Sequence, residues 1–249
     1  MPKKLNLKEE QLKANSQQPK SKGDKNLCII PARGGSKRIP RKNTRDFLGK
    51  PIIAYSIDAA LKSGLFSEVM VSTDDLEIAR LAESFGAKVP FMRTPKNADD
   101  FATTLDVVKE VLKEYEASDN GFDNVCIIYP TAPFATAERL NEGFKKLKDF
   151  EGAIPVTEFS FPVLRSFKIK EHRLSYQWPK HEKARSQDLE TLYHDAGQWY
   201  WIKTAAIQDS LVTDNTAAIV LRNLEVQDID QEEDWRLAEL KYEYLQSTK

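Results

Sequence analysis

The sequence predicts an α/β fold with a mostly parallel, Rossmann-like sheet and a protruding arm. Short apolar runs alternate with stretches whose apolar residues recur at helical spacing. The first apolar run, 27–30, ends in a loop rich in glycine and cations, where open α/β sheets bind their ligands. Between 161 and 179 the pattern changes to the alternation typical of a hairpin, which predicts the arm.

The expected elements follow one another as strand, helix, strand, helix. The predicted strands are 27–30, 68–73, 88–92, 124–129 and 152–157, and alternation returns in 217–221. The predicted helices are 51–63, 76–85, 105–116, 137–148 and 232–246. This order implies parallel strands joined by right-handed crossovers. The unbroken apolar run 124–129 is expected at the sheet centre, because a central strand is buried on both faces.

The composition fits one globular domain that is not drawn as a whole to nucleic acid or membrane. The chain has 249 residues, is 41% hydrophobic and carries a formal net charge of −1. No apolar run approaches the roughly 18 residues of a membrane span, and no apolar segment typical of a signal peptide follows the first lysines. Cys28 and Cys126 lie in predicted strands, as small buried residues of a reducing compartment do. A cytoplasmic protein is therefore expected.

The domain is predicted to begin after a short tail. Residues 1–25 are polar and lysine-rich, which favours a disordered basic tail. Residues 26–249 would form the folded domain, with the arm at about 159–182.

Ala32–Asn43, with the sequence ARGGSKRIPRKN and termed the basic loop below, carries the strongest functional signal. Five of its residues are cations: Arg33, Lys37, Arg38, Arg41 and Lys42. Paired glycines let backbone N–H groups turn toward an anion. The spacing matches neither a Walker A motif nor G-x-G-x-x-G. A solvated surface loop is the alternative, but the position directly after a strand favours a polyanion such as a nucleoside triphosphate.

Asp228 and Asp230 flank Ile229 shortly before the last helix. In an extended segment both carboxylates would lie on one side and Ile229 would face the core. Two carboxylates suit Mg²⁺, which also takes substrate phosphates as ligands. The alternative is a pair of acids that stabilises the N-terminus of the following helix.

The segment IIPARGGSKRIPRKN resembles the first motif of the cytidylyltransferases that activate nine-carbon α-keto acid sugars, the CMP-sialic acid synthetase family, and residues 27–245 fit that family. The resemblance implies a nucleotidyltransferase with CTP as co-substrate, Mg²⁺ held by Asp228 and Asp230, and a homodimer formed through the arm. Arg33, Lys37 and Lys42 would neutralise charge on the phosphates, and Asp230 or a metal-bound water would act as general base. The implied nucleotide-binding residues are Ala32, Arg33, Gly34, Gly35, Ser36, Lys37, Asn43 and Arg93.

Further motifs of the family indicate the sugar site. Arg185-Ser186-Gln187-Asp188 resembles its R-R-Q-D motif, in which Arg185 and Gln187 would grip the sugar acid. Tyr193 and His194 begin a segment that resembles Y-x-x-N-G, with Ala196 in place of Asn, and Tyr129 stands where sialic acid enzymes carry Gln. These departures resemble the branch that uses pseudaminic acid. They imply that the products are CMP-pseudaminic acid and pyrophosphate, for surface glycan or flagellin glycosylation.

Two alternatives to this interpretation stay open. The same chemistry could serve sialic, legionaminic or 3-deoxy-octulosonic acid. A non-catalytic module that binds nucleotide or RNA is less favoured, because the cations gather in one loop rather than over a broad face. Trp199, Tyr200 and Trp201 could lie in the core or stack on the sugar, and alternation places Tyr200 on the face opposite the two tryptophans.

Overall fold

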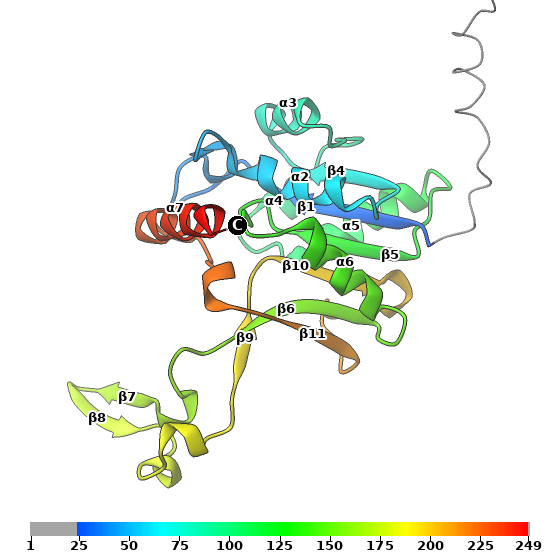
Figure 1. Ribbon diagram of the computed structural model, residues 1–249. Coiled ribbons are helices and arrows are strands. Elements are labelled where there is room, and N and C mark those ends of the chain that lie inside the picture. Colours follow the sequence, from blue (N-terminus) through cyan, green and yellow to red (C-terminus); the bar gives the residue numbers. More distant parts are fainter. Residues whose placement is uncertain (1–23, 249) are drawn as a thin grey trace, which may run out of the picture.

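The computed structural model describes residues 24–248, so the predicted tail lies almost wholly outside the described residues. One sheet runs through the centre, in the order β11-β6-β10-β5-β1-β4 (Figure 1). Its strands are β1 (Asn26–Pro31), β4 (Glu68–Ser72), β5 (Asn124–Ile128), β6 (Gly152–Glu158), β10 (Trp199–Lys203) and β11 (Thr216–Leu221). Strand β9 (Tyr193–Asp195) pairs with β6 beyond this path.

The sheet is mixed but mostly parallel, as predicted. β1 pairs in parallel with β4 and β5, and β6 pairs in parallel with β11. β10 lies between β5 and β6 and runs antiparallel to both, so β4, β1, β5, β6 and β11 share one direction. The inserted strand, β10, was not among the predicted strands, because it lies at the aromatic end of a polar stretch.

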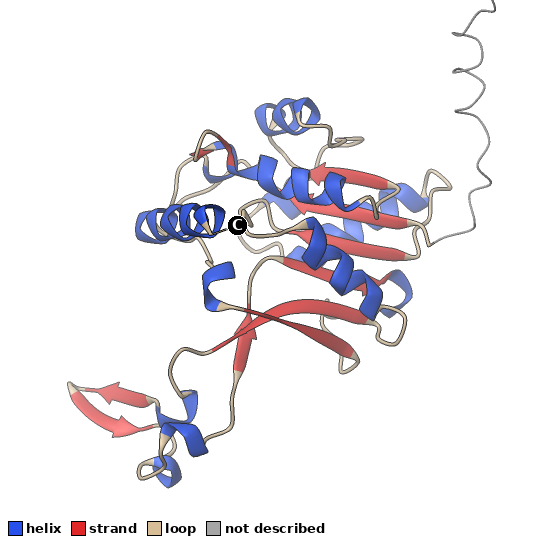
Figure 2. Ribbon diagram, in the orientation of Figure 1, coloured by secondary structure: helices blue, strands red, loops and turns tan. Residues whose placement is uncertain are grey.

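Helices cover both faces of the sheet (Figure 2). α2 (Ile52–Ser63), α3 (Leu76–Ser84) and α6 (Ala137–Lys146) pack on one face, and α5 (Thr104–Glu116) packs on the other. β1 supplies both layers, because its side chains alternate. Cys28 and Ile30 join the first layer, and Leu27 and Ile29 join the second.

The strand predicted at 88–92 is wrong. Only Lys88 forms a bridge, to Met70, and the chain then leaves the sheet. Pro90 lacks the N–H that a ladder needs, which explains why the pairing does not continue. The predicted loop that follows contains the short helix α4 (Pro95–Ala98).

A third apolar cluster lies beyond the carboxyl ends of the strands, beneath the last helix, α7 (Glu232–Ser247). Trp235 of α7 packs edge to face on Phe47, next to the two-residue strands β2 (Asp46–Phe47) and β3 (Lys50–Pro51). Ile229 is buried in this cluster, as its position between two aspartates predicted. The cluster therefore anchors the basic loop through Ile39 and the Asp228–Asp230 segment through Ile229.

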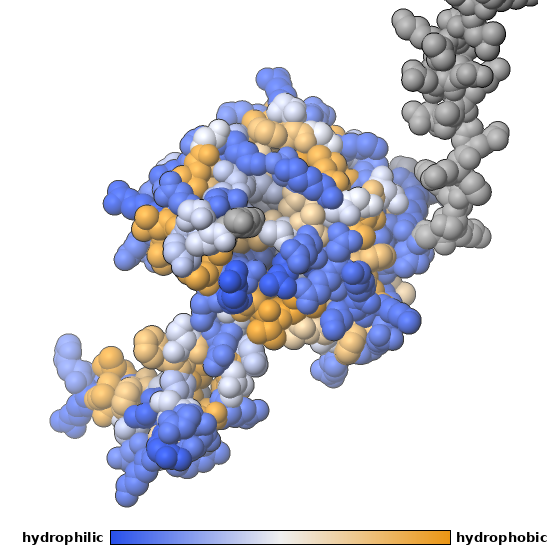
Figure 3. Space-filling model, in the orientation of Figure 1, coloured by the Kyte–Doolittle hydropathy of each residue, from blue (hydrophilic) through white to orange (hydrophobic). Residues whose placement is uncertain are grey.

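The predicted hairpin is present and projects from the body (Figure 1). Its strands β7 (Phe167–Lys170) and β8 (Arg173–Tyr176) pair only with each other. Apolar side chains gather on its surface (Figure 3), where Phe161 is 84% and Ile169 is 75% exposed. The arm was predicted at about 159–182. Below, the term covers the whole segment 159–192, which returns to the body through β9.

Candidate active site

The basic loop starts where β1 ends, and backbone contacts hold it against the neighbouring strand β4. Ala32 N donates to the Ser72 carbonyl oxygen at 2.9 Å, and Asn43 Nδ2 donates to the Arg33 carbonyl oxygen at 2.9 Å. Gly34 N donates to Asp74 Oδ1 at 2.9 Å. A Cβ on Gly34 would lie 2.7 Å from Asp75 Oδ2, so this close approach requires glycine.

Every cation of the loop faces an acid supplied by another part of the chain. Arg33 Nη1 donates to Asp100 Oδ1 at 2.8 Å, and Lys37 pairs with the same carboxylate. The hydrogen bonds and charges of Lys37 and Arg33 lower the pKa of the Asp100 carboxyl. Arg41 pairs with Asp75 at 2.9 Å and adopts a left-handed φ of 55°. The cations of the loop are therefore already paired with carboxylates, which a phosphate ligand would have to replace.

Arg38 and Lys42 turn to the segment before α7. Arg38 Nη2 donates to Asp230 Oδ1 at 2.8 Å, and Lys42 Nζ lies 3.8 Å from the same oxygen. Lys42 Nζ also donates to the Ile229 carbonyl oxygen at 2.6 Å. Desolvation lowers the pKa of Lys42, although Asp230 and Asp228 oppose the shift. The basic loop and the Asp228–Asp230 segment, both identified from the sequence, are thus in direct contact, although about 190 residues separate them.

These residues line a cleft of about 360 Å³. Tyr129, which directly follows β5, also lines the cleft, and the Tyr129 ring packs edge to face on Tyr200. The cleft thus lies beyond the carboxyl ends of two neighbouring parallel strands, β1 and β5, as expected for an open α/β sheet. The lining residues are Pro31, Arg33, Ser36, Lys37, Arg38, Ile39, Lys42, Asn43, Tyr129, Pro130 and Thr131.

Asp228, two residues before Asp230, lines a second pocket, of about 410 Å³, termed the β9 pocket. Desolvation raises the pKa of Asp228, and the charge of Asp230 raises it further. Two carboxylates that repel one another provide a donor set that fits a divalent cation. Within residues 24–248 no group of three or more His, Cys, Asp or Glu side chains is placed to hold a metal, so water molecules or phosphate oxygens would have to complete the coordination.

His194 lines the β9 pocket, but it does not pair with the carboxylate of Asp195. Its Nδ1 lies 2.9 Å from the Asp195 carbonyl oxygen, and its ring packs on Phe159. The Asp195 carboxylate instead accepts hydrogen bonds from Gly197 N and the Tyr200 hydroxyl. His194 is therefore placed to contact a ligand in the pocket rather than to relay a proton through Asp195. The preceding residue, Tyr193, is half exposed.

The three aromatic residues of β10 belong to the core. Trp199 and Trp201 are fully buried in the layer with α6, where their rings pack against Gly143, and Tyr200 faces the opposite layer. The predicted alternation is confirmed. Stacking of Trp199 or Trp201 on a sugar is excluded, because their rings already pack on the protein.

Arg93 is also buried, and its guanidinium already has hydrogen-bond partners. Its Nε and Nη2 donate to the side chain and the carbonyl oxygen of Ser72, at 3.0 and 2.5 Å. Desolvation lowers the pKa of its guanidinium. These contacts fix the end of β4 behind the basic loop, so the structure gives Arg93 a role in shaping the site.

Arg185 and Gln187 lie in the arm, away from the basic loop of the same chain (Figure 1). Arg185 forms a bidentate pair with Asp188, at 2.7 and 3.0 Å, and stays exposed. Gln187 lines a small pocket at the base of the arm with Phe159 and Phe161. The structure therefore brings Tyr129 and His194 toward the site but not Arg185 or Gln187.

Sequence reasoning missed the acids that face the basic loop. Asp100 comes from the loop before α5, and Asp74 and Asp75 follow β4. The second pair could have been found, because the ends of adjacent parallel strands meet at one edge of a sheet. Asp100 had no comparable signal, since only the course of the loop brings it to Arg33.

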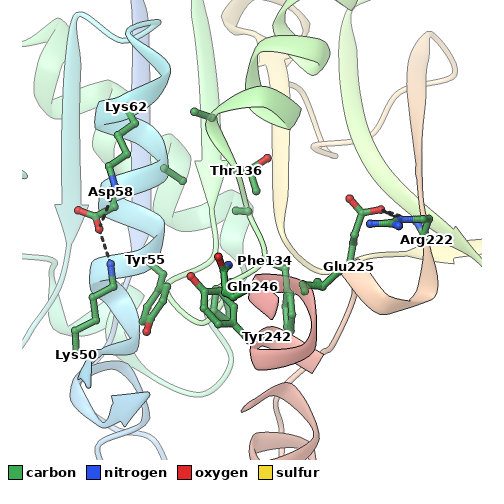
Figure 4. A pocket seen from close by; sticks show the side chains of 15 residues that line it. Lys50, Tyr55, Asp58, Lys62, Phe134, Thr136, Arg222, Glu225, Tyr242 and Gln246 are labelled. Atoms are coloured by element: carbon green, nitrogen blue, oxygen red, sulfur yellow. Dashed lines mark hydrogen bonds and ion pairs between the residues drawn. The ribbon is translucent and has the colours of Figure 1, made fainter. Parts of the chain in front are cut away.

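A separate cavity of about 320 Å³ lies between α2, α6 and α7 (Figure 4). Tyr55, Phe134 and Tyr242 form its centre. Lys50 and Lys62 pair with Asp58 on one side, and Arg222 pairs with Glu225 on the other. It contains no residue of the basic loop, so the cleft described above remains the candidate site.

Comparison with known proteins identifies the family. The model of the cytidylyltransferase family matches residues 27–226. The chain is 44% identical over 224 residues to pseudaminic acid cytidylyltransferase of Campylobacter jejuni, which covers 88% of this chain and 96% of that relative. It is also 44% identical, over 46% of this chain and 49% of the relative, to CMP-N,N'-diacetyllegionaminic acid synthase of Legionella pneumophila. The chain belongs to the cytidylyltransferase family.

A solved structure supports the fold. The CMP:2-keto-3-deoxy-manno-octonic acid synthetase complexed with CTP matches with a TM-score of 0.65 at 19% identity, over 90% of this chain and 99% of the other. At that identity the likeness concerns the arrangement of the sheet and helices alone.

Proposed function

We propose that this cytidylyltransferase joins CTP to pseudaminic acid and releases CMP-pseudaminic acid and pyrophosphate. The observation that carries the proposal is the 44% identity, over 88% of the chain, to a protein named for that activity. The basic loop supports it, because its cations line a cleft next to two carboxylates, as a triphosphate substrate with a divalent cation requires.

In the proposed reaction the anomeric hydroxyl oxygen of the sugar attacks the α-phosphorus of CTP. The bond between that phosphorus and the bridging oxygen breaks, and pyrophosphate leaves. The hydroxyl proton passes to an oxygen of Asp230, one of the two acceptors that the family resemblance left open. Arg33, Lys37 and Lys42 neutralise the charge that develops on the phosphates, with Arg33 and Lys37 exchanging Asp100 for phosphate oxygens. Gly34, Gly35 and Ser36 bring the backbone close to the same phosphates.

We assign Asp228 and Asp230 to a Mg²⁺ ion. When bound, the ion would neutralise phosphate charge and orient the triphosphate. The two aspartates lie between the cleft and the β9 pocket, since Asp230 contacts the basic loop and Asp228 lines the pocket. The nucleotide would therefore occupy the cleft and the sugar would extend toward His194.

We further propose a homodimer in which the arm reaches the partner's site. The arm that carries Arg185 and Gln187 projects away from the body of its own chain (Figure 1). The exposed apolar side chains of the arm need a cover, and a two-fold dimer would supply it (Figure 3). Arg185 would then exchange Asp188 for the sugar carboxylate, a bidentate match.

We place the reaction in the cytoplasm. The support is that Cys28 and Cys126, although paired in register on adjacent strands, are both free thiols, as in a reducing compartment. A separate observation is that no helix among the described residues has the length and apolarity of a membrane span.

The test is release of pyrophosphate with CTP and a panel of keto acid sugars. Pseudaminic and sialic acids share the carboxylate and the anomeric hydroxyl, but they differ in stereochemistry and nitrogen substituents. Each unpaired polar group costs roughly 1–3 kcal/mol, so two or three mismatches give about a thousandfold preference in kcat/KM. A ratio near one for pseudaminic over N-acetylneuraminic acid would refute the assigned sugar.

A second candidate is the same transfer to a legionaminic acid. The observation that favours it is the 44% identity to the Legionella enzyme over about half of this chain. It ranks lower because the Campylobacter relative matches at the same identity over 88% of the chain. The same panel separates the two candidates, since each predicts the highest kcat/KM for its own sugar.

A further inference from the structure

Lys241, in the middle of α7, makes an unusual set of contacts. Its Nζ donates to the carbonyl oxygens of Asn223 and Val226, at 3.2 and 2.7 Å, and to Gln227 Oε1 at 3.0 Å. An ammonium group has three protons, so these acceptors use all of them. Among residues 24–248 no carboxylate lies within ion-pair distance of this ammonium, whereas Lys42 and Lys50 each have one.

Partial burial of a cation without a carboxylate partner costs free energy, which the three hydrogen bonds of Lys241 offset. The three acceptors belong to segment 223–227, which joins β11 to Asp228. This segment contains one short 3-10 turn, Asn223–Glu225, and no strand. Its backbone carbonyl groups therefore lack ladder partners, and the ammonium satisfies two of them.

Other contacts hold the same segment at Glu225. Glu225 pairs with Arg222, as Figure 4 shows, and with Arg139 of α6 at 3.2 Å. The Glu225 carbonyl oxygen accepts from Gln198 Nε2 at 2.6 Å. Downstream, Asp234 caps the amides of Asp230 and Gln231. Lys241 holds the chain between these two sets of contacts, at Val226 and Gln227, directly before Asp228.

We infer that Lys241 is a positioning residue that holds the segment before Asp228, and so keeps Asp228 and Asp230 together at the site. This inference rests on the proposed function, because it takes the two aspartates as the metal-binding pair. Lys241 lines the β9 pocket together with Asp228, but the three protons of its ammonium are directed to segment 223–227. It acts by joining α7 to the chain that carries the carboxylates.

The experiment replaces Lys241 by Met, which keeps the aliphatic stem and removes the donors. Arg236→Met is the matched control, because Arg236 is an exposed cation on the same helix. Binding of Mn²⁺ to each purified protein is measured from the electron paramagnetic resonance signal of the free ion. The Mg²⁺ concentration for half-maximal pyrophosphate release and the KM for CTP are measured alongside, with Asp228→Asn as the reference for a lost metal site.

We expect Lys241→Met to weaken Mn²⁺ binding and to raise the half-saturating Mg²⁺ concentration about tenfold, the usual effect of losing an outer support of a metal site. Arg236→Met should change neither quantity. A Lys241→Met protein within twofold of wild type in both would overturn the inference. If that variant does not fold, Gln227→Leu decides: a smaller shift in the same direction supports the inference, and no shift overturns it.

The proposed metal site can fail separately. If wild type and Asp228→Asn bind Mn²⁺ equally, the assignment of the metal pair is wrong and the inference falls with it. If Asp228→Asn loses binding while Lys241→Met keeps it, only the role of Lys241 is wrong.

Discussion

The basic loop and the arm both carry predicted substrate residues, but their surroundings differ. Arg38 of the basic loop reaches Asp230, and Arg33 reaches Asp100, so the loop is held by distant parts of its own chain. Arg185 of the arm finds its partner three residues away, in Asp188. One region is completed by the fold of a single chain. Among the described residues, the other shows a local ion pair and exposed apolar side chains, which is why we propose that it packs against a second molecule.

The largest expected effect is in the basic loop. Arg33→Ala and Lys42→Ala should each lower kcat by about thirtyfold or more, because one partner of transition-state charge contributes about 2–4 kcal/mol. The measurement is pyrophosphate release at saturating CTP. Lys50→Ala is the control, since Lys50 pairs with Asp58 outside the cleft. Near-normal kcat in both loop variants would show that the loop is not the triphosphate site.

The next prediction tests whether the arm serves the partner's site. Arg185→Ala should lose most activity through a raised KM for the sugar, with the KM for CTP unchanged, because Arg185 would read the sugar carboxylate. In a two-fold dimer, a purified heterodimer of Arg185→Ala and Lys42→Ala chains holds one intact site, so about half of the wild-type activity per dimer should return. An inactive heterodimer would mean that the arm acts within its own chain.

A smaller effect is expected in the assembly itself. Ile169→Asp places a charge on the exposed apolar face of β7 and should weaken the dimer, as light scattering at micromolar concentration would measure. Lys168→Asp is the matched control, because neighbouring residues of a strand point to opposite faces. Equal masses for Ile169→Asp and wild type would remove this face from the interface.

The smallest effect concerns the support behind Gly34. Desolvation opposes ionisation of Asp75, but the amides of Ile78 and Glu77 and the charge of Arg41 outweigh it and lower its pKa. Asp75→Ala removes this cap of α3 and should cost about 1 kcal/mol in the free energy of unfolding.

A group with a lowered pKa stabilises the fold above its unfolded pKa and loses that contribution as the pH falls through its folded pKa. The difference between wild type and Asp75→Ala in urea unfolding should therefore be full at pH 7 and shrink below about pH 4. Asp75→Asn, which keeps a capping oxygen, should lie between them. A difference that grows on acidification would contradict the assigned role of Asp75.

The sequence by itself determined features that depend on neighbouring residues. The alternation around Ile229 correctly placed it in the core, and that of 199–201 placed Trp199 and Tyr200 on opposite faces. The hairpin in the arm and the strand that leads into the basic loop were also correct. Such patterns span only a few residues, because the geometry of a strand repeats every two.

Only the tertiary structure decided which distant residues meet. It inserted β10 antiparallel into the sheet, reduced 88–92 to a single bridge, and set Asp100 against Arg33 and Asp230 against Arg38. It also placed Arg185, which was expected to grip the sugar acid, in the arm. The two ion pairs join residues 67 and 192 positions apart in the chain. Local preferences cannot specify them, because they depend on how whole strands and helices pack around a shared core.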